Sequence, residues 1–124
     1  MKRSILYLDD EDMCLRVFQD MFRADYDVRV TSSLKMARGE LAARPADIII
    51  SDQHMPDIEG TDFLREVAED YPASYRVLLT GEIMIGHVMS EVSTGIIHLF
   101  IPKPWDEPQM RQMLEQANAS FERH

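Results

Sequence analysis

The chain has 124 residues, of which 45% are hydrophobic and 28% charged, a composition typical of a globular domain and not of a disordered or fibrous protein. Its 22 acidic residues outnumber 13 Lys and Arg, and the net charge of -9 disfavours nucleic acid and anionic membranes as direct partners. There is no apolar run of about 18 residues and no cleavable leader, so we expect a cytoplasmic protein with a single domain over residues 1–124.

Five short stretches rich in Ile, Leu and Val predict β-strands. They begin 20 to 29 residues apart, which is enough for one strand and one crossover helix. Several are nearly continuous apolar runs, as expected for a parallel sheet that helices cover on both faces. In chain order the predicted strands are residues 4–8, 27–31, 47–51, 76–80 and 98–102.

Segments with a helical period lie between these strands. Residues 11–23 and 60–70 carry apolar side chains at spacings of three and four. A third apolar stripe follows Asp106, which can cap a helix that has Pro108 in its first turn. Alternating strands and helices with right-handed crossovers predict a doubly wound α/β fold with three layers.

Two residues that can bind metals or undergo redox chemistry are poor candidates for such a site. Cys14 is the single cysteine, so it cannot form a disulfide within the chain, and we expect a buried, unreactive thiol. His54 follows an acidic stretch but has no second histidine at ligand spacing. Its side chain is therefore not favoured as a transition-metal ligand.

Acidic and cationic residues lie where the predicted strands end. Strand one ends in LDDED, strand three in SDQHMP, strand four in LTGE and strand five in FIPKP. Parallel strands bring these ends to one edge of the sheet, so Asp9, Asp10 and Asp52 should lie close together. Two carboxylates about 4 Å apart repel by roughly 4 kcal/mol at an effective dielectric of about 20, and a bound cation or a raised pKa would offset this. Mg²⁺ favours such oxygen ligands.

The same edge carries groups suited to phosphoryl transfer. Lys103 provides an ammonium and Thr80 a hydroxyl, and a cation would offset the repulsion between phosphate and Asp52 acting as a nucleophile. Taken singly, Asp9 and Asp10 are also explained as favourable charges at a helix N-terminus, and Thr80 as an ordinary strand residue. Their occurrence together at the strand ends favours the functional interpretation.

Four motifs, LDDE, SDQHMPDIEG, LLTGE and IPKPW, occur in the order and spacing of a known family. With them the chain resembles the receiver domain of bacterial two-component response regulators over essentially its whole length. The resemblance implies a flavodoxin-like (βα)5 fold whose five-stranded parallel sheet has the order 2-1-3-4-5. It also implies that Asp52 is the phosphoacceptor and that Mg²⁺ or Mn²⁺ is held by Asp10, Asp52 and the backbone carbonyl of His54, with Asp9 acting through water.

The resemblance further implies roles around the phosphoryl group. Lys103 would bind that group, and Thr80 would rearrange toward it. Phe100, on the fifth strand, would move with Thr80 as an aromatic switch that differs from tyrosine in having no hydroxyl. His54 and Glu82 would occupy variable positions beside the phosphoryl group and tune how fast it is gained and lost.

A sensor histidine kinase or a phosphotransfer protein is the implied source of the phosphoryl group. In this family the face made by the fourth helix, fifth strand and fifth helix is the usual partner surface. Residues 83–89, IMIGHVM, are unusually apolar for a helix with an exposed face, and Gly86 weakens that helix. We therefore expect a homodimer or an effector domain to bind through residues 83–121.

Two other functions stay open from the sequence. One is a receiver-like interaction module that works without phosphorylation, although every phosphorylation residue is present. The other is a phosphatase with an aspartate nucleophile, similar to haloacid dehalogenase-like enzymes, which would need a second acid after the first strand and a cap insertion. We expect no enzyme beyond self-phosphorylation from small donors and self-dephosphorylation. The KPW ending resembles receivers that precede output domains, so both a stand-alone regulator and a piece of a longer protein are compatible with it.

Overall fold

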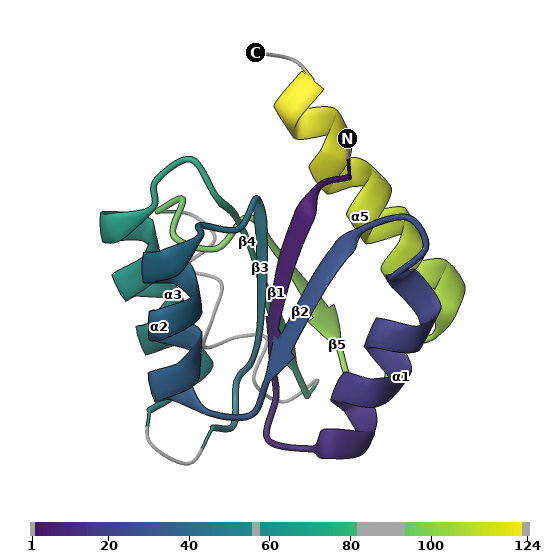
Figure 1. Ribbon diagram of the computed structural model, residues 1–124, viewed down its shortest axis with the longest axis horizontal. Coiled ribbons are helices and arrows are strands. Elements are labelled where there is room, and N and C mark those ends of the chain that lie inside the picture. The colour runs from purple at the N-terminus through teal and green to yellow at the C-terminus, as the bar shows by residue number, and fades with distance from the viewer. Residues whose placement is uncertain (1, 56–57, 82–93, 123–124) are drawn as a thin grey trace.

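The computed structural model of the protein describes residues 2–55, 58–81 and 94–122 (Figure 1). Within that part of the chain the strands are β1 (Ser4–Leu8), β2 (Asp27–Thr31), β3 (Ile48–Asp52), β4 (Tyr75–Thr80) and β5 (Leu99–Pro102). The helices are α1 (Asp12–Phe22), α2 (Leu34–Ala43), α3 (Gly60–Asp70) and α5 (Glu107–Glu122). The predicted helix over residues 83–89 and the rate-tuning residue Glu82 lie outside the described residues.

The five strands form one parallel sheet in the order β2-β1-β3-β4-β5. Figure 1 shows α1 and α5 on one side of this sheet and α2 and α3 on the other. The predicted doubly wound fold and its strand order are therefore confirmed. Right-handed crossovers between parallel strands explain why the helices divide between the two faces.

The core has two halves, one on each face of the sheet. Successive strand residues point to opposite faces, so Ile5 and Ile50 join the half that packs against α1 and α5, here called the α1/α5 half. Leu6 and Ile49 join the half that packs against α2 and α3, here called the α2/α3 half. Every residue of β1, β3 and β4 is buried, which explains why these strands are nearly continuous apolar runs.

The structure moves four strand boundaries by one residue each, at both ends of β3 and at the starts of β4 and β5, and it defines a helix for which the periodicity gave no range. Asp52 is the last residue of β3 rather than the residue after it. The predicted (βα)5 fold includes a crossover helix here, but the periodicity gave no range for it, because its buried stripe of Leu34, Ala37 and Leu41 is short and Met36 between them is 60% exposed. Ser33 begins this helix in the usual way, since its side chain accepts a hydrogen bond from the Met36 N–H.

The expectation of a buried Cys14 is wrong. Cys14 is partly exposed because it lies at the margin of the apolar stripe of α1, one position before the buried Leu15. Its thiol donates to a carboxylate oxygen of Glu11 over 3.6 Å. No helix formed by the described residues is both long and apolar enough to cross a bilayer.

Candidate functional site

Strand alternation places three charged side chains on the same face of the sheet. Asp9, Asp52 and Lys103 each follow, by two residues, a buried side chain of the α1/α5 half. Side chains two residues apart along a strand point the same way, so all three project on the α1/α5 side. The pairing of β1 with β3, in which Leu8 lies opposite Ser51, sets the two acidic strand ends beside each other.

The predicted acidic cluster is formed. Carboxylate oxygens of Asp9, Asp10 and Asp52 lie within 4.8 Å of one another. Asp9 is 0% exposed and Asp52 3%, whereas Asp10 is exposed at the mouth of the site. Hard oxygen atoms at this spacing, two of them buried and one exposed, form a donor set that fits Mg²⁺ or Mn²⁺.

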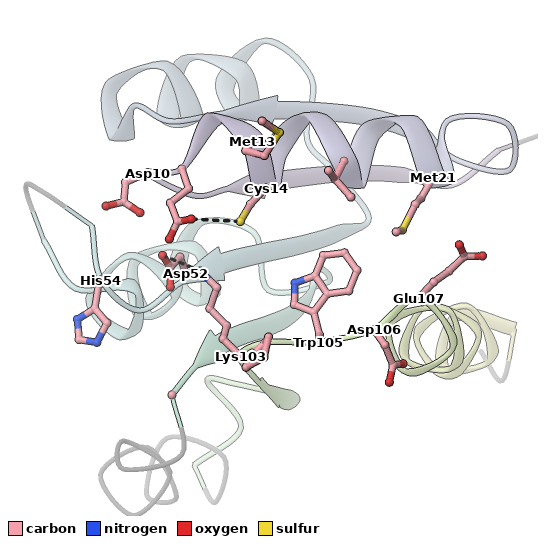
Figure 2. Close-up of a pocket in the computed structure, with 14 residues that line it drawn as sticks. Asp10, Met13, Cys14, Met21, Asp52, His54, Lys103, Trp105, Asp106 and Glu107 are labelled. Atoms are coloured by element: carbon pink, nitrogen blue, oxygen red, sulfur yellow. Dashed lines mark hydrogen bonds and ion pairs between the residues drawn. The ribbon is translucent and has the colours of Figure 1, made fainter.

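Lys103 connects the two buried carboxylates. Its ammonium lies 3.3 Å from Oδ2 of Asp9 and 3.3 Å from Oδ2 of Asp52. In Figure 2 its side chain extends toward Asp52 from the segment after β5. The backbone N–H of Lys103 donates to the carbonyl of Thr80 over 2.9 Å. This bond holds Lys103 beside the end of β4.

Burial and charge shift the pKa values of this group in a consistent way. Burial raises the pKa of Asp52, the Asp9 charge raises it further, and Lys103 opposes both without cancelling them. For Lys103, burial lowers the pKa, but the charges of Asp9 and Asp52 outweigh that effect and the pKa is raised. Lys103 therefore stays charged. The ionised form of Asp52 is disfavoured by burial and by the nearby charge of Asp9.

Gln53 joins the end of β3 to the start of α3, and this role was not predicted from the sequence. Its backbone carbonyl accepts from the Gly60 N–H and its side-chain oxygen from the Thr61 N–H, both over 2.9 Å. These bonds satisfy the first amides of α3, whose N-cap residue Glu59 makes no side-chain cap. The one available signal was a polar amide directly after a buried strand.

Gly60 permits α3 to begin against the backbone of Asp52. A Cβ atom at position 60 would lie 2.3 Å from the Asp52 carbonyl oxygen and 2.9 Å from Cδ1 of Leu78. No side chain fits at that distance, so glycine is required here by close approach. The helix start thereby holds the end of β3 in place.

Thr80 and Phe100 lie on the opposite face of the sheet from Lys103. Thr80 is 0% exposed at the end of β4, two residues after Leu78. Phe100 pairs with Leu78 and packs, partly buried, against the α2/α3 half. The two residues predicted to form a switch are therefore neighbours on one face.

His54 lies at the rim of the site. Its side chain is exposed, and its backbone N–H donates to the Asp52 carboxylate. In Figure 2 the imidazole lies beyond Asp52 and away from Lys103.

A cavity that the sequence did not predict opens beside the acidic cluster. It has a volume of about 780 Å³ and runs from Asp52 and Lys103 along α1 to the start of α5 (Figure 2). Met13, Val17 and Trp105 give it an apolar wall. The site is thus open to solvent on the α1/α5 side.

Comparison with known proteins finds a matching family model and several similar proteins. The family model described as "Response regulator receiver domain" matches residues 5–115. The hydrogenase transcriptional regulatory protein HoxA of Cupriavidus necator is 29% identical over 114 residues, and the DNA-binding transcriptional regulator NtrC of Escherichia coli is 23% identical over 124 residues. These matches cover 92% and 98% of the chain but only 24% and 26% of the relatives, so the chain spans about a quarter of their length.

Solved structures of receiver proteins are similar to this chain over nearly its whole length. The signal receiver domain of an HD domain-containing protein from Pseudomonas fluorescens Pf-5 is 26% identical, with a TM-score of 0.91 over 100% of both chains. The chemotaxis protein CheY4 of Vibrio cholerae is 20% identical, with a TM-score of 0.83 over 94% of this chain and 99% of that one. The match to CheY4 shows a shared fold.

Proposed function

Since the chain belongs to the family of response regulator receiver domains, we propose that it is a phosphorylation-controlled switch whose phosphoacceptor is Asp52. The observation that carries this proposal is the contact of Lys103 with both Asp9 and Asp52 at 3.3 Å, beside a third carboxylate from Asp10. Three carboxylates and one ammonium at the end of a buried strand suit the transfer of a phosphoryl group to a carboxylate.

In the transfer step an oxygen of Asp52 attacks phosphorus on a phosphohistidine of a sensor kinase or phosphotransfer protein. The new P–O bond forms as the P–N bond breaks, and the electron pair returns to the imidazole nitrogen. Lys103, already 3.3 Å from Asp52, moves its contact to the incoming phosphoryl oxygens. Mg²⁺ or Mn²⁺, held by Asp10, Asp52, the His54 carbonyl and, through water, Asp9, would neutralise the negative charge of the phosphoryl group.

The switch would run through Thr80 and Phe100. A phosphoryl group on Asp52 attracts the Thr80 hydroxyl, and the space it leaves admits the Phe100 ring. Because phenylalanine has no hydroxyl, the two positions of this ring differ only in packing and burial. Phe100→Ala should therefore leave phosphorylation largely intact while weakening partner discrimination. An equal loss in phosphorylation and in binding assays would argue against this coupling.

The partner surface includes β5 and α5 together with residues 82–93, which lie outside the described residues. We infer that a homodimer or an effector domain binds through residues 83–121 and not nucleic acid directly, given the net charge of -9. The relatives HoxA and NtrC are described as transcriptional regulators and are about four times longer than this chain, which supports an effector domain as the partner. His54 and Glu82 would tune the lifetime of the phosphorylated form.

Intact mass after incubation with acetyl phosphate and Mg²⁺ tests the function. The unaltered protein should gain one phosphoryl group and Asp52→Asn none. Asp47→Asn is the matched control, because Asp47 directly precedes β3 at its other end and accepts from the Ser4 N–H over 3.0 Å. It should be labelled like the unaltered protein. Equal labelling of Asp52→Asn would overturn the assignment.

A further inference from the structure

Tyr7 has a buried hydroxyl in a place where a phenyl ring alone would fill the core. The residue is 0% exposed on β1, and its ring packs 4.7 Å from that of Phe18, centroid to centroid. A buried hydroxyl needs a hydrogen-bond partner. Here the hydroxyl donates to Oδ2 of Asp9 over 2.5 Å, which is at the short end of the range for a hydroxyl bonded to a carboxylate.

The Asp9 carboxylate is held by three donors. Oδ2 accepts from the Tyr7 hydroxyl and from the Lys103 ammonium, and Oδ1 accepts from the Glu11 N–H over 3.0 Å. An oxygen of a carboxylate offers about two lone pairs, so both of those on Oδ2 are used. Oδ1 keeps one for a cation or its water. The Tyr7 hydroxyl thus helps to set the orientation of the Asp9 carboxylate.

The same contact determines how Lys103 is shared. Asp9 and Asp52 compete for its ammonium at equal distances of 3.3 Å. A hydroxyl bonded to Oδ2 lowers the negative charge that Asp9 presents to Lys103. Without that hydroxyl, Oδ2 has Lys103 as its remaining donor, and the ammonium would be drawn toward Asp9 and away from Asp52.

We propose that Tyr7 is a positioning residue, which orients Asp9 toward the cation site and keeps Lys103 available to Asp52. This inference rests on the proposed function. It concerns residue 7 because strand alternation gives Tyr7 and Asp9 the same face, and the hydroxyl at the far end of the Tyr7 ring reaches the Asp9 carboxylate.

The direct test is the Mg²⁺ affinity of Tyr7→Phe, which keeps the ring and removes the hydroxyl. Trp105, the single tryptophan, lines the same cavity as Asp52 and Lys103, and its fluorescence can report binding. Loss of a group that orients a metal ligand typically weakens metal affinity by about 10-fold or more, and that is the expected result. Phosphorylation by acetyl phosphate at saturating Mg²⁺ should also slow several-fold.

Two further variants separate this role from general damage to the fold. Tyr26→Phe also removes a hydroxyl from a buried ring, one that accepts from Asn118 over 2.9 Å, and it should leave the Mg²⁺ affinity unchanged. In an Asp9→Asn background, Tyr7→Phe should change that affinity less than about twofold, because the group it positions is altered. An unchanged affinity of Tyr7→Phe, or the same loss in both backgrounds, would overturn the role of Tyr7.

A measurement on the unaltered protein covers the case in which Tyr7→Phe does not fold. The hydroxyl proton of Tyr7 should exchange slowly with solvent in NMR spectra, and its chemical shift should move when Mg²⁺ is added. A shift that does not respond would overturn the proposal for Tyr7. If the unaltered protein binds no Mg²⁺ at all, the proposed function fails instead, so the two failures are distinguishable.

Discussion

Two largely buried cations lie at opposite ends of the parallel strands and are held in different ways. The end where the strands finish is here called the carboxyl edge, and the end where they begin is called the amino edge. Lys103, at the carboxyl edge, lies 3.3 Å from one oxygen each of Asp9 and Asp52. Arg76, near the amino edge, is 5% exposed and forms no ion pair among the described residues. Its guanidinium donates instead to neutral carbonyl oxygens, with distances of 3.0 Å to Ser74, 3.1 Å to Gly95 and 2.6 Å to Ile96.

The two edges differ in whether the contacts of the buried cation can be exchanged for others. Under the proposed function, the contacts of Lys103 with the two carboxylates would give way to another cation or move to a phosphoryl group. The bonds of Arg76 join the segment before β4 to the segment before β5, and no soluble ligand can replace them. The proposed function therefore requires the carboxyl edge to tolerate a change of charge, while the bonds of Arg76 fix the chain at the amino edge.

Replacement of Lys103 by Met should have the largest effect. Loss of one positioned charge at a reacting group typically costs on the order of 10²- to 10³-fold, so phosphorylation by acetyl phosphate should slow by about that factor. Without Mg²⁺ the variant should also lose stability, because Asp9 and Asp52 are left without their counter-ion, and Mg²⁺ should restore much of it. Urea unfolding with and without Mg²⁺ measures this. Phosphorylation within about tenfold of the unaltered rate would contradict the importance of Lys103.

Replacement of Arg76 by Met should act on stability alone. Several buried carbonyls lose their donor, and we expect a loss of about 3 kcal/mol in the free energy of unfolding. Added Mg²⁺ should stabilise this variant by the same increment as the unaltered protein, since its cation affinity is unchanged. A larger Mg²⁺ increment than in the unaltered protein would mean that the two edges are coupled.

A pair of glycine substitutions tests how rigidly the end of β3 is held. Gly60→Ala should destabilise the protein by about 3 kcal/mol, because its Cβ would lie 2.3 Å from the Asp52 carbonyl oxygen. Gly39→Ala, on the exposed face of α2 where a Cβ meets nothing within 4 Å, should stabilise it by up to about 1 kcal/mol. Urea midpoints compare the two. Equal effects would show that α3 does not press on Asp52.

The two edges should respond to acid with opposite sign, and this is the smallest predicted effect. The pKa of Asp52 is raised by burial and then by Asp9, so the folded protein binds that proton more readily, and stability should rise as the pH falls through the raised pKa. The pKa of His98 is lowered from 6.5 by burial and then by the Arg76 charge, so stability should fall as the pH drops through 6.5 and below.

Unfolding free energies without Mg²⁺ from about pH 7.5 to pH 4.5 separate these contributions. Asp52→Asn should remove the gain in acid. His98→Asn should remove the loss while keeping an acceptor for the Arg76 N–H, which donates to Nδ1 of His98 over 3.0 Å. If neither variant changes the slope, other groups control the pH dependence.

The strand positions could be predicted from short apolar runs, and the acidic cluster from the strand ends that a parallel sheet brings together. Asp9, Asp52 and Lys103 come two residues after core side chains, so parity along the strand fixes their direction before any loop is placed. The contact of Asp9 with the Tyr7 hydroxyl needs a particular rotamer. The cap that Gln53 forms on α3 needs a closed loop. Neither leaves a periodic signal, and both were missed.

The errors have the same origin. No range was predicted for helix α2 because an exposed methionine interrupts its short stripe, and Cys14 was expected to be buried although it lies one position from the buried Leu15 of α1. Periodicity locates the centre of a buried face better than its margin. The cavity beside the acidic cluster lies along such a margin, between α1 and the start of α5.

The most direct test of the central claim is to locate the phosphoryl group chemically. Borohydride reduces an aspartyl phosphate to homoserine, and peptide mass spectrometry then identifies the residue. After incubation with acetyl phosphate and Mg²⁺, homoserine should appear at position 52 alone. Homoserine at Asp9 or Asp10, or a stable phosphoryl group on His54, would contradict the assignment of Asp52 as the phosphoacceptor.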